Sequence, residues 1–328
     1  MTIKISIIGL RKIGASIGLA LAQIKDQATR VGNDRDPGIS KQAEKMGAVD
    51  KTTFNLPSAV RDADIVILAV PVNEIRETLE AIAPDLKPGS VVIDTSPLKD
   101  KVMQWAKEFL PGNDRYFVSV TFSTNPAYFN EIGDVTEKAH ADLFQNSLML
   151  ISSLPGIDES ALNLTTNLAQ ILGAQPLFSD AVEIDGLLAS THLLPKLISV
   201  ALVNATVSQT GWREARKVAG QVYARVTEPA LHPDEEKEMG KTALYNAENT
   251  LRVLDQFLAE IHGIRDAIAN QEETELHNLL ENALVEREQW WQQRLAANWD
   301  PKPTQNISLP TGGEIFGRLF GIRPKKDK

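Results

Sequence analysis

The chain has 328 residues, which is enough for two domains with separate cores. Hydrophobic residues make up 43% of it and charged residues 23%, as in ordinary globular proteins. The net charge of −9 excludes nucleic acid as a main partner, because phosphate backbones require clustered Lys and Arg. The absence of cysteine excludes disulfides, thiolate nucleophiles and cysteine-based metal sites, and it fits a reducing compartment.

The N-terminal residues MTIKISIIGL predict a first strand rather than a targeting segment. Their apolar run is too short for the core of a signal peptide, and it ends in a glycine turn. Elsewhere no window comes near the roughly 20 apolar residues that a bilayer requires. We therefore expect a cytoplasmic protein with no membrane partner.

Short β-branched runs alternate with helical patterns in the first half of the chain. Near-continuous apolar runs such as DIVILAV and SVVIDT are typical of strands buried on both faces of a parallel sheet. The predicted strands are Ile3–Ile8, Ala28–Asn33, Asp64–Val70, Ser90–Asp94, Tyr116–Val120 and Ser147–Ser152. The predicted helices are Lys12–Lys25, Ser40–Met46, Val72–Ile82 and Lys99–Phe109. This alternation predicts an α/β domain over residues 1–179 with a doubly wound, mostly parallel, Rossmann-like sheet.

The pattern becomes helical after about residue 180. The stretch Leu187–Val207, interrupted by Pro195, is apolar on nearly every side, and a small helical domain can hardly bury it alone. We therefore expect an all-α domain over residues 180–300 that forms an intertwined homodimer. Residues 301–328 are rich in Pro and Gly and predict an extended tail, whose EIFGRLFGI segment either docks on a partner subunit or frays.

The glycine turn GLRKIGASIG admits three interpretations. A P-loop would need a lysine where Ala15 stands, and without it the β/γ-phosphate contact is lost. A dinucleotide fingerprint, G-x-G-x-x-G, is met by Gly9 and Gly14 but has Arg11 in the middle. The preceding strand, the following helix and Asp34 beyond them support this second interpretation. A structural turn, with glycines only for tight packing, is the third.

Arg11 bears on the geometry and the identity of the cofactor. It replaces the glycine that lets the backbone approach the pyrophosphate, so its side chain either pairs with the phosphates or occupies their place. Lys12 and Arg35 add positive charge, and Arg35 beside Asp34 suits an adenosine 2′-phosphate, so NADP competes with NAD as the expected cofactor. The expected cofactor-binding residues are Gly9, Arg11, Lys12, Ile13, Gly14, Asp34, Arg35, Val70 and Pro71.

The chain resembles the prephenate/arogenate dehydrogenase family over roughly residues 3–270. The resemblance rests on IIGLRKIGASIGLALA, VGNDRDP, ADIVILAVPVNEIRETLEAIAPDLKPGSVVIDTSPLKDKV, LLPKLISVALVNA and GWREARKVAG. It implies an N-terminal dinucleotide domain and a C-terminal helical dimerisation domain. It also implies oxidation of prephenate or arogenate with NAD(P) in tyrosine biosynthesis. In that reaction a hydride leaves the ring carbon that bears the hydroxyl, and loss of carbon dioxide makes the ring aromatic.

Besides Arg11, three positions depart from the pattern that this resemblance implies. Thr121, in VSVTFSTNP, stands in the place of the catalytic histidine, and a hydroxyl is too basic once ionised to serve as general base near neutral pH. Ser96, in TSPLK, lies one position from the serine beside the nicotinamide, with Lys99 in place. Lys217 replaces the substrate-binding arginine, which is the better bidentate clamp for a carboxylate.

His192, in STHLLPK, is the candidate replacement base, because its helix is expected to border the cleft between the domains. A core or helix-facing histidine is the commoner case. Arg213, Arg216 and Lys217 around Trp212 form either an anionic-substrate site or a solvated helix face. The other histidines show no i, i+4 pair and no nearby carboxylate cluster, so no metal site is expected; they are His140, His232, His262 and His277.

Three functions stay open at this point. The first is an NAD(P)-dependent dehydrogenase of the prephenate/arogenate type, acting on a small-molecule carboxylate. The second is a catalytically impaired homologue that only binds a dinucleotide or metabolite. The third is a dehydrogenase for a different carboxylate substrate. If the alignment of the active site is wrong, the carboxylates of the 130–142 loop are the next place to seek the base.

Overall fold

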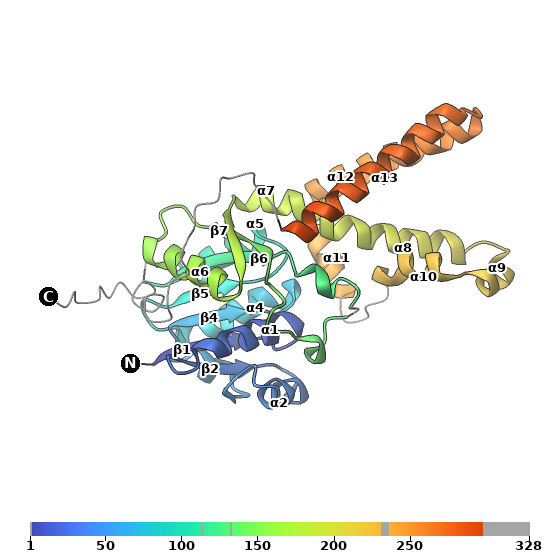
Figure 1. Ribbon diagram of the computed structural model, residues 1–328. Helices are drawn as coiled ribbons and strands as arrows, with labels where there is room; N and C mark the ends of the chain where they lie inside the picture. The colour runs from blue at the N-terminus through green and yellow to red at the C-terminus, as the bar shows by residue number, and fades with distance from the viewer. Residues whose placement is uncertain (1, 113, 132, 231–235, 298–328) are drawn as a thin grey trace. The chain divides into compact units, whose positions relative to one another are not determined.

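The computed structural model describes residues 2–112, 114–131, 133–230 and 236–297 (Figure 1). The chain divides into two compact units. The first runs to Ala181 and includes the end of the last helix from Gln289, and the second comprises Val182–Glu288. The expected tail over residues 301–328 lies outside the described residues.

The first unit is built on one eight-stranded sheet with the order β3-β2-β1-β4-β5-β6-β7-β8. The strands from β3 to β6 in this order are parallel to one another, β7 is antiparallel to β6, and β8 is parallel to β7. The strands are β1 Ile3–Ile8, β2 Ala28–Asn33, β3 Lys51–Thr52, β4 Ile65–Leu68, β5 Val91–Asp94, β6 Tyr116–Phe122, β7 Ser147–Ser153 and β8 Ala174–Phe178. The expected mostly parallel, Rossmann-like sheet is confirmed.

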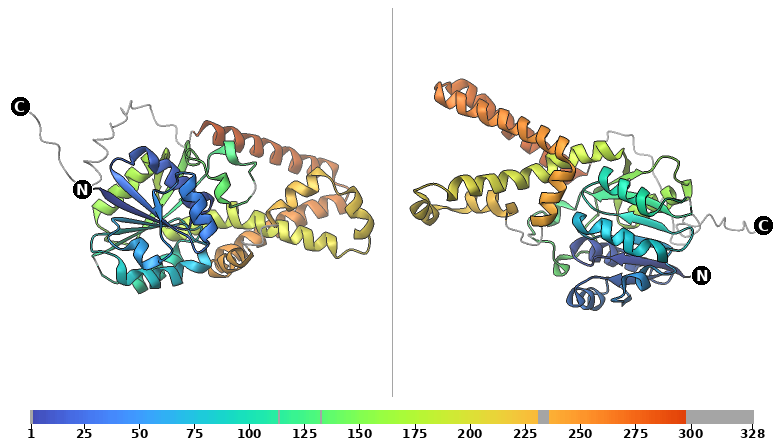
Figure 2. Two further views of the ribbon diagram at one scale, coloured as in Figure 1. Left: turned by 90° about the horizontal axis from the view of Figure 1, so that it is seen from below. Right: turned by 180° about the vertical axis from the view of Figure 1, so that it is seen from behind.

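Helices cover both faces of this sheet (Figures 1 and 2). The helices of the first unit are α1 Lys12–Leu21, α2 Pro37–Lys45, α3 Leu56–Val60, α4 Val72–Ile82, α5 Asp100–Phe109 and α6 Glu159–Ile171. Alternate residues of each central strand enter two separate cores: Ile65 and Ile67 of β4 pack with α1 and α6, whereas Val66 and Leu68 pack with α3, α4 and α5. This is the doubly wound arrangement that the apolar strand patterns predicted.

The second unit is helical. Its helices are α7 Ala181–Leu188, α8 Leu194–Val207, α9 Trp212–Val218, α10 Gln221–Thr227, α11 Glu236–Tyr245, α12 Ala247–Ala269 and α13 Glu273–Ala296. Inside it, the Ser199 hydroxyl donates to the carbonyl of Val226 at 2.9 Å, and the hydroxyls of Thr206 and Tyr223 lie 2.7 Å apart. These bonds attach α10 to α8.

A π-helical turn at Ala189–Leu193 joins α7 to α8, so Pro195 does not break the long apolar helix. A π turn re-routes the hydrogen bonds of a helix, and it suits a position where proline supplies no N–H. The continuous helix Ala181–Val207 has a mean hydropathy of 1.5 over its most apolar window, and by length and composition alone it could cross a membrane. The expectation that no window reaches that length was wrong, because the few polar residues, such as Asp185 and Lys196, are too widely spaced to lower the average.

Candidate active site

The residues expected to bind the cofactor gather at one edge of the sheet. The carboxyl ends of the parallel strands β1, β2, β4, β5 and β6 share this edge, and strand order reverses between β1 and β4. The glycine turn follows β1, Asp34 follows β2, and Val70 and Pro71 follow β4, with Pro71 at the start of α4. Crevices at such a reversal are where open α/β sheets bind ligands.

The glycines of the turn are needed by the backbone itself. Gly9 has a φ of +88°, and a Cβ there would overlap the carbonyl oxygen of Ala69 at the end of β4. A Cβ at Gly14 would overlap the carbonyl oxygen of Gly9, so α1 approaches the turn as closely as it does only because residue 14 has no side chain. Ile13 packs against the core. Tight packing therefore explains both glycines, whether or not a ligand binds.

Asp34 connects the turn to the end of β2. Its Oδ2 accepts a hydrogen bond from the backbone N–H of Leu10 at 2.9 Å, and its Oδ1 accepts one from the N–H of Asp36 at 2.9 Å. The neighbouring Arg35 side chain is 78% exposed and forms an ion pair with Glu74 of α4, with an Nη1 to Oε1 distance of 2.7 Å. An arginine at this position is available to solvent and is held by one carboxylate only loosely.

The connection between β6 and β7 folds over the start of α1. The backbone N–H of Lys12 donates to Oδ1 of Asp134 at 3.1 Å, and the Lys12 Nζ lies 3.1 Å from Oε2 of Glu131. The Thr136 hydroxyl donates to the carbonyl of Leu10 at 2.9 Å. Residues more than 115 positions apart in sequence thus meet at the glycine turn.

His140 belongs to this connection, and its ring lies beside a carboxylate. Its Nε2 lies 2.8 Å from Oε1 of Glu131, because the connection turns back on itself between the two residues. Partial desolvation raises the pKa of Glu131, but hydrogen bonds from Lys12 and His140 outweigh that effect and leave the pKa below its ordinary value.

Tyr128 forms the other side of this cluster. Its ring stacks on the His140 ring with centroids 3.9 Å apart, and its hydroxyl donates to Oδ1 of Asp142 at 2.6 Å. That hydrogen bond to a carboxylate, with partial burial, raises the pKa of Tyr128 to about 12. Among the described residues, no group of three or more histidine or acidic side chains is arranged to hold a metal ion.

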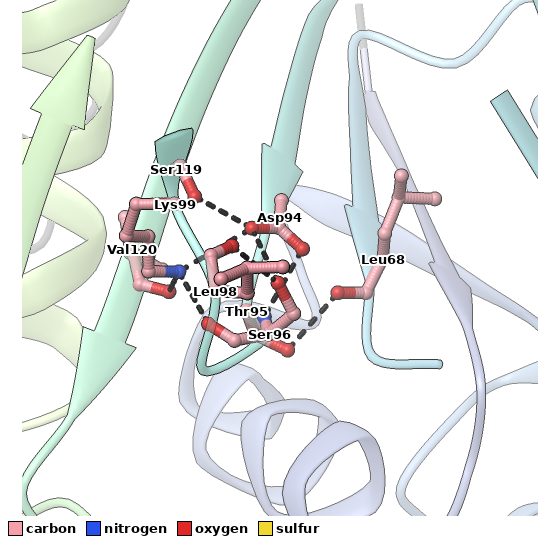
Figure 3. A network of polar contacts seen from close by, with 8 residues as sticks. All are labelled: Leu68, Asp94, Thr95, Ser96, Leu98, Lys99, Ser119 and Val120. Carbon is pink, nitrogen blue, oxygen red and sulfur yellow. Dashed lines mark hydrogen bonds and ion pairs between the residues drawn. The ribbon is translucent and has the colours of Figure 1, made fainter. Parts of the chain in front are cut away.

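Ser96 lies in a buried polar network after β5 (Figure 3). Oδ2 of Asp94 accepts hydrogen bonds from the hydroxyls of Ser96 at 3.0 Å and Ser119 at 2.5 Å. Lys99 has no exposed surface, and its Nζ lies 3.3 Å from the same oxygen. That Nζ also donates to the carbonyls of Ser96 and, at 2.6 Å, Val120. The Ser96 hydroxyl also lies 3.1 Å from the carbonyl oxygen of Leu98. The network joins the ends of β5 and β6, so Ser96 is held by Asp94, Leu98 and Lys99 rather than pointing freely outward.

Thr121 lies next to this network on β6. It pairs with Leu150 of β7 and is 7% exposed. It follows directly after Val120, whose carbonyl Lys99 holds. Thr121 and Ser96 therefore share the carboxyl edge of the sheet with the glycine turn.

The remaining expected site residues lie in the second unit. His192 is exposed and sits in the π-helical turn, a type of helix distortion that is common at functional sites. Arg213, Arg216 and Lys217 are exposed on α9, and Lys217 forms an ion pair with Glu214 one turn away. The structure therefore brings the cofactor residues, Ser96 and Thr121 to one edge of the first unit and places the other four residues in the second.

Two family models match the chain in succession. "Prephenate dehydrogenase, nucleotide-binding domain" matches residues 17–177, and "prephenate dehydrogenase, dimerization domain" matches residues 180–282. The chain belongs to the prephenate dehydrogenase family. It is an oxidoreductase homologue with an NAD(P)-binding domain and a dimerisation domain, as the sequence resemblance implied. The first match begins at residue 17, beyond Gly9 and Gly14.

Individual relatives agree with this assignment. The chain is 27% identical over 281 residues to a cyclohexadienyl dehydrogenase of Zymomonas mobilis, covering 82% of this chain and 89% of that one. It is 23% identical to a prephenate dehydrogenase of Bacillus subtilis, covering 84% and 72%. Among solved structures, prephenate dehydrogenase from Aquifex aeolicus, in complex with hydroxyphenyl propionate and NAD+, has the same fold with a TM-score of 0.77 and 20% identity. That match covers 88% of this chain and 98% of the other.

Proposed function

We propose that this protein is an NAD(P)-dependent dehydrogenase that oxidises prephenate or arogenate with loss of carbon dioxide. The observation that carries the proposal is the succession of the two family domains over residues 17–282, together with a dinucleotide-type turn at the strand-order reversal. We take the functional boundary between the two domains to lie near residue 180. A cytoplasmic location fits such a biosynthetic enzyme.

The first unit fits a dinucleotide. The strand, tight glycine turn and helix are in place, and Asp34 stands at the end of β2, where an acid binds the ribose hydroxyls. We assign Gly9, Ile13 and Gly14 to shaping the turn, and Val70 and Pro71 to the wall after β4. Arg11 and Lys12 supply positive charge at the start of α1, where backbone N–H groups favour phosphate.

Arg35 is the residue that we propose to favour NADP. It is exposed beside Asp34 and its one ion pair, with Glu74, is a surface contact that a 2′-phosphate can replace. NADP therefore binds at least as well as NAD in this proposal.

The catalytic roles follow from what the side chains can do. When bound, NAD(P)+ accepts a hydride from the substrate. We propose that Thr121 and Ser96 orient the substrate through their hydroxyls. We propose that His192 accepts the proton of the substrate hydroxyl, because an imidazole is a suitable general base near neutral pH. Arg213, Arg216 and Lys217 are proposed to bind the substrate carboxylate.

A second candidate function rests on one observation. Thr121 stands where the family resemblance implies a histidine, and a threonine hydroxyl is a poor general base. A homologue that binds the dinucleotide or a metabolite without efficient turnover would also account for it. A dehydrogenase for another carboxylate differs only in the substrate that it accepts.

Calorimetric titration of the purified protein with NAD+ and NADP+ tests the cofactor assignment. We expect both to bind, with NADP+ at least equal to NAD+. The Arg35→Ala substitution should lower the affinity for NADP+ about tenfold and leave the affinity for NAD+ nearly unchanged, since only NADP+ carries the 2′-phosphate. Arg76→Ala is the control, because Arg76 is also a surface arginine paired with a glutamate. Absence of heat for either cofactor at millimolar concentration would leave a purely structural glycine turn.

A further inference from the structure

The segment that covers the start of α1, called here the capping segment, comprises Glu131 and residues 133–140. Two contacts that involve no charge fix it on either side of the glycine turn. The Thr136 hydroxyl, which is buried, donates to the carbonyl of Leu10, and the backbone N–H of His140 donates to the hydroxyl of Ser16 at 3.0 Å. The C-terminal part of the segment is thereby attached to both ends of the turn.

Two carboxylates of the same segment occupy the positive end of α1. Oδ1 of Asp134 accepts the backbone N–H of Lys12, the first residue of the helix, and Glu131 pairs with the Lys12 ammonium. The first turn of α1 contains no acidic residue, and Arg11 at the N-cap makes no side-chain capping bond. The anion at this helix terminus is thus supplied by a segment about 120 residues away.

A dinucleotide requires the same groups. In folds of this kind the pyrophosphate lies at the N-terminus of the first helix and accepts hydrogen bonds from its backbone N–H groups. A phosphate and the carboxylate of Asp134 cannot share one N–H, and like charges at this separation repel each other. While Glu131 pairs with the Lys12 ammonium, that ammonium cannot pair fully with the phosphate.

We propose that Asp134 and Glu131 hold the phosphate-binding end of α1 as an internal anion, which a dinucleotide displaces when it binds. This inference rests on the proposed dinucleotide site. Thr136 and the His140 backbone keep the capping segment attached while the two carboxylates leave. Displacement releases Lys12 for the phosphates, and the work of breaking both contacts weakens the affinity for any phosphate-bearing ligand.

Titration of the full-length protein with NAD+ and with adenosine tests the inference, in the wild type and in Asp134→Ala, Glu131→Gln and Glu137→Gln. Glu137→Gln is the matched control, because Glu137 is an exposed glutamate of the same segment whose carboxylate accepts from Gln42. Adenosine is the matched ligand, because it lacks the phosphates. We expect the first two variants to bind NAD+ about tenfold more tightly than the wild type, with adenosine affinity and the control unchanged.

Amide hydrogen exchange of the wild type gives a readout independent of affinity. Binding of NAD+ should speed amide exchange over residues 133–135 and slow amide exchange over α1. Unchanged or weaker NAD+ binding in Asp134→Ala and Glu131→Gln, or slower exchange of residues 133–135, would overturn the inference but leave the dinucleotide site intact. Failure of every variant and the wild type to bind NAD+ or NADP+ would overturn the dinucleotide site and the inference together.

Discussion

Lys99 carries a charge with no access to water, which is costly unless every donor finds an acceptor. Asp94 and the carbonyls of Ser96 and Val120 supply those acceptors, and the hydroxyls of Ser96 and Ser119 complete the shell of the carboxylate. The pair therefore fixes the loop after β5 against β6. Its value to the site is positional, since it determines where Ser96 and Thr121 lie.

Replacing Lys99 by methionine should destabilise the protein strongly. The substitution retains most of the side-chain volume but leaves the buried Asp94 carboxylate unpaired, which costs about 3–5 kcal/mol of unfolding free energy. Urea denaturation measures the loss. Lys107→Met on α5, the helix that follows Lys99, is the control, because Lys107 is exposed, and it should change stability by no more than about 0.5 kcal/mol. A loss below about 1 kcal/mol for Lys99→Met would contradict the role of Lys99 as the partner of the buried Asp94 carboxylate.

Substitutions at Thr121 and His192 test which residue acts as the catalytic base. Turnover of prephenate should be slow if Thr121 replaces the base, because a positioned acid–base group contributes about 10²–10⁴-fold to rate. Steady-state rates should then rise in Thr121→His and vanish in His192→Ala, with Ser190→Ala as the control from the same helix. An efficient wild-type rate that His192→Ala leaves unchanged would move the base elsewhere, with the acidic residues of the β6–β7 connection as the next candidates.

Sequence could place single residues of the site where the signal was local. Gly9, Gly14 and Asp34 follow from a strand, a turn and the end of the next strand, and all lie at the expected edge of the sheet. The contacts of Lys12 could not be foreseen, because Glu131 and Asp134 lie about 120 residues away and no periodic pattern marks their loop. The sequence shows that these two residues are acidic, but it does not show that their side chains point toward Lys12.

At the scale of elements, the packing of α1 against the glycine turn positions the whole cofactor edge. Gly14 lies where the helix and the turn are in direct backbone contact, so a methyl group there must push α1 away. Gly14→Ala should cost about 1–3 kcal/mol by overpacking and weaken dinucleotide binding. Thermal denaturation together with NAD+ titration measures both effects.

The control for Gly14→Ala is Gly240→Ala in α11. A Cβ at Gly240 meets nothing within 4 Å, so alanine there should stabilise the helix by about 0.5–1 kcal/mol through its higher helix propensity. If Gly14→Ala proved as stable as the wild type, this result would contradict the direct backbone contact between α1 and the turn at Gly14.

The elements that sequence predicted best are those with strong apolar runs. Strands β1 and β2 have the predicted bounds, and β4 to β7 differ by two residues or fewer at either end. Strand β3 escaped prediction because it has two residues, and β8 because it is a half-exposed edge strand containing Pro176. Helix α6 was missed although its buried residues recur at spacings of three and four, a pattern that would have predicted it.

At the scale of the whole molecule, the second unit exposes more apolar surface than a monomer normally carries. Among the described residues, large apolar side chains that are more than half exposed include Val182, Val218, Val222, Leu244, Leu251, Leu258, Ile268, Leu280, Leu284 and Val285. Exposed apolar surface of this extent is typical of an interface, and the family model that matches this region is a dimerisation domain. A second subunit that covered the long apolar helix Ala181–Val207 would account for its exposed apolar side chains in the same way.

The protein should therefore be a homodimer in solution. Light scattering at micromolar concentration should give twice the chain mass of 36.0 kDa. The mass should persist in high salt, because burial of apolar surface rather than charge drives the association. A mass of one chain would contradict both the proposed assembly and the account of the apolar helix.

The direct test of the central claim is a dehydrogenase assay of the purified full-length protein with prephenate and with arogenate, each with NAD+ and NADP+. Reduction of the dinucleotide is followed by absorbance, and the aromatic product and carbon dioxide are measured in the same samples. We predict reduction that depends on one of the two substrates, with one carbon dioxide released for each dinucleotide reduced. Tight binding of NAD+ or NADP+ with no reduction for either substrate would contradict the claim and leave a dinucleotide-binding homologue or a dehydrogenase for another carboxylate.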